Sequence, residues 1–233
     1  MTKFVGFTTN GEYSVGCTGQ TVFLLDKNHN VLKKFKDMVY AYKPAIAPNG
    51  SFFVVKSTGG CLAVYSLETF SLLKKFRFSK VDGSQDDGFC FSPDSRFFIN
   101  IERQNDSLQC AVSTYRTSDF SLVDQILFDK DMMISEIECE ENTCFVLGFV
   151  RNSQGIMDHG FVAKFENSRV QNELALKDDE YHFYSAYKSL ERFGFTEKQY
   201  AWMYIDCELE KLKTMNLTLA KLYAQKQEAM QQL

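Results

Sequence analysis

The stretch Phe89-Cys-Phe-Ser-Pro-Asp-Ser-Arg-Phe-Phe-Ile-Asn-Ile101 predicts two short β-strands joined by a tight turn. Pro93 fixes the backbone angle required at the first corner of the turn, and Asp94 and Ser95 can hydrogen-bond to backbone groups there. The apolar residues on either side have the short length and aromatic content of buried strands. The same hairpin pattern recurs along the chain, which indicates a fold built from repeated units.

Three other stretches repeat this pattern of strand, turn and strand. They are Val5–Val15, Ala45–Val55 and a fainter copy at Ile137–Leu147. Together with the first hairpin they open four units that recur about every 40 to 50 residues. Their common offset from the turn predicts equivalent positions for Phe7, Ala47, Phe91 and Cys139.

Each unit offers four predicted strands rich in β-branched or aromatic residues. In the first and second units they span 4–8, 13–17, 21–26, 31–36, 45–47, 51–57, 61–67 and 72–78. In the third and fourth units they span 88–91, 96–103, 109–116, 122–128, 135–139, 143–150, 160–165 and 170–176. Four antiparallel strands per unit at this spacing are typical of β-propeller blades.

The turn Phe91-Ser-Pro-Asp-Ser-Arg-Phe-Phe98 resembles the "FSPDG" turn of WD40-like and YVTN-like propeller repeats, and Ala47-Pro-Asn-Gly-Ser-Phe-Phe53 is similar. The resemblance covers residues 3–177 and implies a fold without implying one function. The chain departs from the WD40 pattern, because no Trp-Asp pair closes a blade and no Gly-His pair opens one. We expect residues 1–177 to form a mostly β domain of four propeller-like blades.

The first and the last unit each contain a complete set of four predicted strands. Neither terminus therefore supplies a spare strand to complete a blade at the other. Either the blades close into a small ring by packing their faces together, or they form an open arc. An open arc would leave an apolar end face exposed, which is a liability in solution. The chain that follows the last unit is the candidate to cover such an end.

Residues 178–233 change from the alternating pattern of strands to the period of helices. They predict a C-terminal helical arm, either a helical hairpin or one long helix. Asp178 and Asp179 can cap its first helix. Thr196-Glu-Lys-Gln199 is a predicted capping box, and the helix that it opens spans 197–230 without Pro or Gly.

This last helix carries apolar residues in the heptad pattern of a coiled coil. The core positions are Ile205, Leu209, Leu212, Asn216, Leu219, Tyr223 and Met230. Asn216 is costly in a core unless it has a partner, and the commonest partner is the same residue on a second helix. The pattern predicts a homodimer held by residues 197–230. The alternative is that the helix folds back onto its own blades with Asn216 at a wet margin.

Composition and charge narrow the partners and the compartment. A net charge of −4 gives no electrostatic case for binding nucleic acid or an anionic membrane. No stretch is apolar and long enough for a membrane span or a signal peptide, so we expect a cytoplasmic protein with reduced thiols. On this expectation Cys139 and Cys144 are inert thiols. A cross-strand pair and half of a metal site are the alternatives.

Candidate chemistry is confined to an acidic cluster in the fourth unit. Glu136 and Glu138 alternate along one strand, with Asp129 and Asp131 nearby. Paired carboxylates can bind a cation or transfer protons, and these two would face a central channel if their strand is innermost. No histidine or arginine lies beside them in sequence. We expect no catalytic residue, no resident metal and no cofactor.

The sequence therefore favours a non-enzymatic protein–protein interaction or scaffold module, with a propeller-like body and a helical arm for self-association. The alternative is a propeller-type ligand-binding protein or metal-dependent hydrolase that uses the central channel. The resemblance allows this alternative, because several propeller families hydrolyse lactones or bind sugars and metals there. Glu136 and Glu138 would then be the cation ligands.

Overall fold

The computed structural model describes residues 4–80, 88–107, 109–140, 143–166 and 169–176, and in these residues it contains β-strands and no helix. The first sheet contains β1 (Gly6–Thr9), β2 (Tyr13–Cys17), β3 (Val22–Asp26) and β4 (Val31–Phe35). The second contains β5 (Ala41–Ile46), β6 (Phe52–Ser57), β7 (Cys61–Ser66) and β8 (Leu72–Arg77). The third contains β9 (Phe89–Phe91), β10 (Phe97–Arg103), β11 (Cys110–Arg116) and β12 (Leu122–Leu127). The fourth contains β13 (Met132–Glu140), β14 (Thr143–Arg151), β15 (Met157–Glu166) and β16 (Arg169–Leu176).

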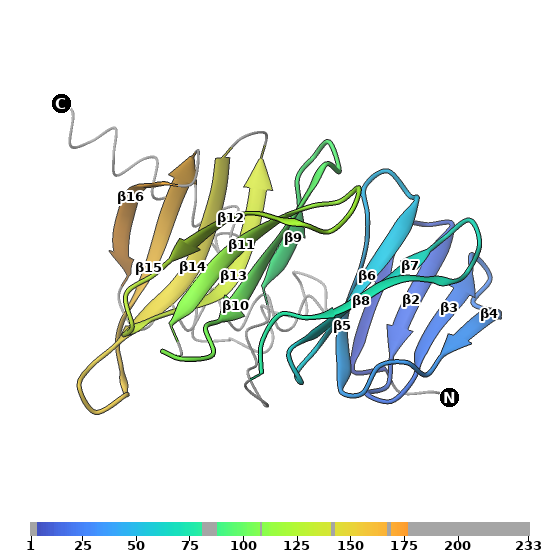
Figure 1. Ribbon diagram of the computed structural model, residues 1–233, viewed down its shortest axis with the longest axis horizontal. Helices are drawn as coiled ribbons and strands as arrows, with labels where there is room; N and C mark the ends of the chain where they lie inside the picture. The colour runs from blue at the N-terminus through green and yellow to red at the C-terminus, as the bar shows by residue number, and fades with distance from the viewer. Residues whose placement is uncertain (1–3, 81–87, 108, 141–142, 167–168, 177–233) are drawn as a thin grey trace, which may run out of the picture.

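Within every sheet the strands pair antiparallel in chain order, from β1-β2-β3-β4 to β13-β14-β15-β16. Figure 1 shows the sheets following one another along the long axis, with β4 near one end and β16 at the other. The prediction of four four-stranded antiparallel sheets is therefore confirmed. The predicted helical arm, 178–233, lies outside the described residues. None of the described residues forms a helix that is long and apolar enough to cross a membrane.

Most observed strands begin and end within about two residues of the predicted ones, whereas β5, β13 and β15 begin earlier. β5 begins at Ala41 and includes Pro44, which has no backbone donor. Such a residue is tolerated because β5 is the first strand of its sheet and pairs on its other side only through a single bridge between Ala41 and Gly19. The pairing with β6 also shifts register between Ala41 and Lys43.

The turns that open the first three units each contain a residue with a left-handed backbone. Gly11, Gly50 and Ser95 have φ values of 90°, 69° and 58°. Glycine adopts this conformation without steric cost, whereas serine adopts it at a steric cost. The hydroxyl of Ser95 accepts a hydrogen bond of 3.1 Å from the backbone N–H of Asn49, which joins the turns of the third and second sheets.

The predicted equivalence of four residues between the units is wrong, and Ala47 is displaced by one residue from Phe91. The backbone N–H of Ala47 donates to the carbonyl of Phe52, and that of Ser92 donates to the carbonyl of Phe97, each over 2.9 Å. Ala47 therefore corresponds to Ser92, since both precede the proline of the turn, and it does not correspond to Phe91. The other three residues lie within first strands but are not equivalent, because Phe7 pairs with Gly16, Phe91 with Phe98 and Cys139 with Cys144, at three different distances from the turn.

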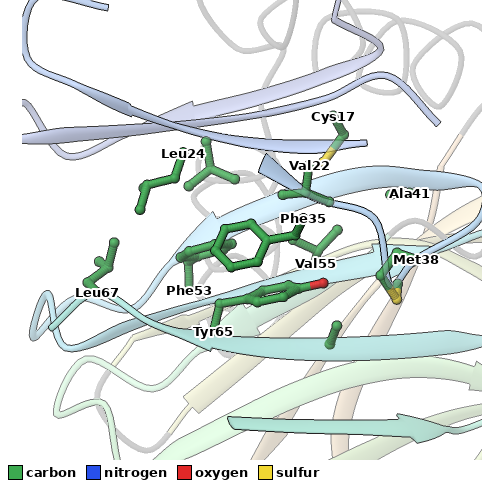
Figure 2. Close-up of a cluster of buried hydrophobic side chains, with 12 residues drawn as sticks. Cys17, Val22, Leu24, Phe35, Met38, Ala41, Phe53, Val55, Tyr65 and Leu67 are labelled. Atoms are coloured by element: carbon green, nitrogen blue, oxygen red, sulfur yellow. The ribbon is translucent and has the colours of Figure 1, made fainter. Parts of the chain in front are cut away.

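Each pair of consecutive sheets encloses its own apolar core. Figure 2 shows the core between the first and second sheets, where Phe35 and Phe53 meet the ring of Tyr65. Their ring centroids lie 4.3 Å and 4.9 Å from that of Tyr65. The buried hydroxyl of Tyr65 donates to Asp37 Oδ2 over 3.0 Å, so it has a partner. Burial, followed by the charge of Asp37, raises the pKa of Tyr65.

Two further cores fill the junctions of the second with the third sheet and of the third with the fourth. The second core contains Ala47, Phe52, Val54, Leu62, Val64, Phe89, Phe98, Tyr115 and Phe120. The third contains Ile99, Ile101, Cys110, Val112, Phe128, Ile134, Ile137, Val146, Phe161, Ala163 and Phe165. Strand β6 contributes to two cores from its two faces and is buried at every residue.

A phenylalanine in the last turn of a sheet packs on the sheet before it. Phe70, between β7 and β8, and Phe120, between β11 and β12, have positive φ values of 50° and 55°. The ring of Phe70 lies 6.1 Å from that of Tyr13, and the ring of Phe120 lies 5.7 Å from that of Phe52. Tyr13 and Phe52 each begin the second strand of the preceding sheet, so the same contact repeats at two junctions.

The face of the fourth sheet that points away from the third sheet is buried as well. Side chains alternate along β14, so Val146 faces the third sheet while Phe145 and Leu147 face the opposite way. Phe145 and Leu147 are 2% and 0% exposed. These apolar side chains are therefore covered within a single chain.

The core of the first junction gives a prediction for stability. Replacing Phe53 with alanine removes a fully buried ring that touches two aromatic neighbours. We expect Phe53→Ala to lower the free energy of unfolding by about 3–5 kcal/mol, measured by urea denaturation of the full chain. The control Val39→Ala removes an exposed side chain and should change it by less than about 0.5 kcal/mol. Equal effects of the two substitutions would contradict this packing.

Candidate functional site

The junction between the second and third sheets has an apolar part and a polar part. On the second sheet, Phe52, Val54 and Lys56 alternate along β6 toward the third sheet. On the third sheet, Phe98 is followed along the same face of β10 by Asn100 and Glu102. Lys56, Asn100 and Glu102 are all buried.

Glu102 is the centre of a group of polar side chains that we call the Glu102 cluster. Its members are Lys56, Asn100, Glu102, Ser113, Tyr115 and Gln125. The carboxylate accepts hydrogen bonds from the hydroxyl of Tyr115, from Asn100 Nδ2 over 3.1 Å and from Ser113 Oγ over 2.8 Å. Gln125 Nε2 donates in turn to Ser113 Oγ over 2.8 Å.

Strand register brings these side chains together. The antiparallel pairing of β10 with β11 sets Asn100 opposite Ser113 and Phe98 opposite Tyr115. The pairing of β11 with β12 sets Ser113 opposite Gln125. Residues opposite each other in an antiparallel pair have side chains on the same face. Three neighbouring strands therefore direct their polar side chains to Glu102.

Lys56 adds the contribution of the second sheet to the cluster. It is 0% exposed, and its Nζ donates to the carbonyl of Ile101 over 2.7 Å and to that of Gly88 over 3.3 Å. The same ammonium lies 5.1 Å from the ring centroid of Phe78. Because Gly88 and Ile101 belong to the third unit, Lys56 hydrogen-bonds across the junction. A buried ammonium is tolerated when its donors are satisfied in this way.

Burial and hydrogen bonding act on Glu102 in opposite directions. Desolvation raises the pKa of Glu102, and the hydrogen bonds from Tyr115, Asn100 and Ser113 oppose this, as does the charge of Lys56. The net effect is a raised pKa. Burial and the charge of Glu102 also raise the pKa of the Tyr115 hydroxyl, which therefore stays protonated and donates.

The Glu102 cluster is enclosed and is not a reaction chamber. Lys56, Asn100 and Ser113 have no exposed surface, and Glu102 is 3% exposed. A substrate cannot reach the carboxylate without separating the two sheets. Asn100 Oδ1 is buried without a hydrogen-bond partner among the described residues. The Glu102 cluster can therefore hold the two sheets together through Lys56, and its stability can change when Glu102 gains or loses a proton.

A shallow pocket lies at the junction between the third and fourth sheets. It has a volume of about 570 Å³ and is lined by Ser107, Gln109, Asp129, Lys130 and Asp131. Gln109 is fixed there by a 3.1 Å hydrogen bond from its Nε2 to the carbonyl of Phe128. The pocket brings together two of the acidic residues noted in the sequence, with a lysine between them.

The predicted cation ligands do not join that pocket. Glu138 lies on the face of β13 opposite to Ile137 and Cys139, which face the third sheet. The side chain of Glu136 lies outside the described part of the structure, and register shifts between Ile134 and Glu136. Within the described ranges, no group of three or more His, Cys, Asp or Glu side chains is placed to hold a metal ion.

The expectation that Cys139 and Cys144 are inert thiols is wrong. The two residues face each other directly across β13 and β14, and their sulfurs form a disulfide with an S–S distance of 1.97 Å. Side chains that are directly opposite on paired strands are close enough to form a disulfide. The sequence spacing of the two cysteines did not determine this register.

The predicted self-association residues lie outside the described residues. They are Ile205, Leu209, Leu212, Asn216, Leu219, Tyr223 and Met230. Sequence reasoning also missed the Glu102 cluster. The available signal was a charged residue inside an apolar strand, as in Phe52-Phe-Val-Val-Lys56 and Phe97-Phe-Ile-Asn-Ile-Glu102.

Four consecutive antiparallel sheets that repeat one hairpin define a β-propeller-like protein. The structure is similar to that of hydrazine synthase from Kuenenia stuttgartiensis, with a TM-score of 0.60 and 17% sequence identity. The match covers 76% of this chain and 51% of that chain, so this chain spans about half the length of the one it matches. At this identity the similarity shows the fold alone. No protein family model matches the sequence, and no curated protein matches it.

The raised pKa of Glu102 predicts a pH dependence of stability. A carboxyl group with a raised pKa stabilises the folded state fully below its unfolded pKa of about 4.3, and this contribution is lost as pH rises through the folded pKa. We expect the stability of the wild type relative to Glu102→Gln to fall as the pH rises above about 5. Urea denaturation at each pH measures this difference.

The chosen range avoids carboxylates that titrate at lower pH. The backbone hydrogen bond from Arg96, with those from its side chain and Ser92, holds the pKa of Asp94 at about 2. The exposed Glu12, replaced by glutamine, is the matched control and should leave the pH dependence unchanged. A difference between wild type and Glu102→Gln that stays constant or grows with pH would show that Glu102 has no raised pKa.

Proposed function

We propose that this protein is a non-enzymatic interaction module, in which the outer strands of the sheets dock a protein partner and the C-terminal arm joins two copies. The observation that carries the proposal is a pair of exposed apolar residues at the start of the last strand of three successive sheets. The pairs, which we call the outer apolar pairs, are Val31 and Leu32, Leu72 and Leu73, and Leu122 and Val123.

The outer apolar pairs combine two properties of docking surfaces. Each of the six side chains is between 41% and 58% exposed, although all are large and apolar. They also lie on β4, β8 and β12, each of which is the last strand of its sheet and has an unpaired backbone edge. Exposed apolar side chains that recur on sheet edges are typical of sites where a partner contributes apolar contacts or an added strand.

Charged residues beside these pairs limit indiscriminate association. Two lysines follow the pair on β4 and on β8, and edge lysines oppose pairing of sheet with sheet. Lys74 and Lys75 also donate to the backbone carbonyls of Asp119 and Asp37, so they are fixed to the neighbouring sheets. β12 carries Asp124 and Gln125 instead of lysines, so its edge differs in charge from the other two.

The predicted arm supplies the self-association part of the proposal. Phe145 and Leu147 are buried on the face of the fourth sheet that points away from the third sheet. We infer that the first part of the arm covers this face. Residues 197–230, with their heptad pattern, then join a second copy. The alternative from the sequence is that this helix also packs on its own sheets.

The docking surface is tested by capture of partners with the tagged full chain. The double substitution Leu72→Ser with Leu73→Ser removes one outer apolar pair, and both replaced side chains are exposed. We expect partners bound by the wild type to bind at least about tenfold more weakly, a loss of about 1.4 kcal/mol. Ile156→Ser, at an exposed turn between β14 and β15, is the control and should bind as the wild type does. Identical binding by all three proteins would remove the outer strands from the proposal.

Self-association is tested by light scattering coupled to size-exclusion chromatography at micromolar concentration. We expect the full chain to have twice its monomer mass of 26.8 kDa. Leu212→Lys with Leu219→Lys places charges at core positions and should give the monomer. Thr214→Lys with Thr218→Lys adds the same charges outside the heptad core and should remain dimeric. A monomeric wild type would refute the dimer and favour a helix folded onto its own sheets.

A further inference from the structure

Three sulfur atoms meet where the third and fourth sheets touch. Cys90 lies in β9, Cys139 in β13 and Cys144 in β14, and β9 contacts β13. Cys139 and Cys144 form a disulfide within the fourth sheet. The Sγ atom of Cys90 lies only 3.4 Å from the Sγ atom of Cys139. A thiol from one sheet therefore touches a disulfide of the next.

We propose that these three cysteines, the sulfur triad, form a thiol–disulfide exchange site that moves a disulfide between two places in the fold. Cys90 loses its proton to solvent, and the thiolate attacks Cys139 Sγ. The bond from Cys139 to Cys144 breaks as the bond from Cys90 to Cys139 forms. Cys144 leaves with the electron pair as a thiolate and takes up a proton. One disulfide and one thiol are present before and after, so the step needs no oxidant.

The position of Cys139 makes it the sulfur that exchanges. It touches both other members of the triad, whereas no direct contact between Cys90 and Cys144 is needed for the step. All three residues are partly buried and packed at the margin of the third core, so solvent can accept and return the proton. Small thiols and disulfides of the glutathione class are the ligands that such a site would take.

The thiol of Cys17 is a contrast within the same chain. It is 0% exposed, and burial raises its pKa to about 12. The thiolate is the reactive form, so Cys17 is expected to be inert. The sulfur triad differs from it in exposure and in having a second sulfur within contact distance.

Exchange changes what the disulfide connects. The bond between Cys139 and Cys144 closes a hairpin with a sequence separation of 5. A bond between Cys90 and Cys139 would span 49 residues and join the third sheet to the fourth. A covalent link across a longer loop restricts the unfolded chain more strongly, so the exchanged form holds the two sheets together against separation.

The full-length protein is incubated at mildly alkaline pH, quenched by acid, alkylated, and digested without reduction by trypsin and a protease specific for glutamate. Cleavage at Glu140 or Glu141 separates Cys139 from Cys144, so mass spectrometry distinguishes the two disulfides. We expect both disulfides in the wild type and in Cys61→Ser, whose altered thiol is partly buried against the core of the first and second sheets. Cys90→Ser should contain only the disulfide between Cys139 and Cys144.

A second variant keeps the proposal testable if the wild type strongly favours one disulfide. Cys144→Ser leaves Cys90 and Cys139 together, and treatment with oxidised glutathione should join them within the chain. Circular dichroism that matches the wild type verifies that the variant is folded. The proposal is refuted if folded Cys144→Ser carries glutathione on Cys139 without forming the bond to Cys90. Formation of that bond supports the proposal, even when the wild type shows one disulfide.

Discussion

Burial of the sheets on both faces is the constraint on which the rest of this structure depends. Strand β6 has no exposed residue, because one of its faces completes the core with the first sheet and the other completes the core with the third. A sheet of this kind cannot be stable alone, since removing either neighbour exposes a row of large apolar side chains. Stability therefore resides in the junctions between consecutive sheets, as in other repeat architectures.

The junction of the second and third sheets meets this constraint in an unusual way, because it buries a carboxylate and an ammonium. Burial of such groups is costly unless their hydrogen bonds are satisfied. Glu102 has three donors, and Lys56 donates to two backbone carbonyls of the third unit. The bonds to Glu102 lie within the third sheet, whereas those of Lys56 cross the junction, and directional bonds across a junction favour one relative position of the two sheets. The Glu102 cluster thus adds specificity to a junction that the aromatic core stabilises.

The features that support a function lie on the outer strands and at the margins of these junction cores. The outer apolar pairs are on the last strands, where the blade repeat leaves backbone edges unpaired. The sulfur triad lies at the margin of the third core, where two sheets meet near solvent. Both locations follow from the same architecture, because stacked sheets leave their outer edges and the rims of their junctions as the accessible parts of the chain.

Local chemistry explains why the sequence predicted most of the fold. Alternating apolar residues and turn formers act over a few positions, so strands such as β2, at Tyr13–Cys17, were predicted at their observed bounds. The early start of β5 was missed because Pro44 and the nearby register shift do not follow a regular strand pattern. The equivalence of Ala47 with Phe91 failed because two similar turns differ by one residue before their left-handed position.

The sequence by itself determined the strands, the turns and the repeat, because each depends on backbone preferences and side-chain periodicity within a short stretch. Only the tertiary structure decided which distant residues meet. Register set Cys139 opposite Cys144, and the packing of the third sheet on the fourth brought Cys90 to the same sulfur. Packing of the second sheet on the third likewise enclosed Lys56 with Glu102. Contacts between residues far apart in the chain leave no periodic trace in the sequence, because periodicity records which face of a strand is buried and not what buries it.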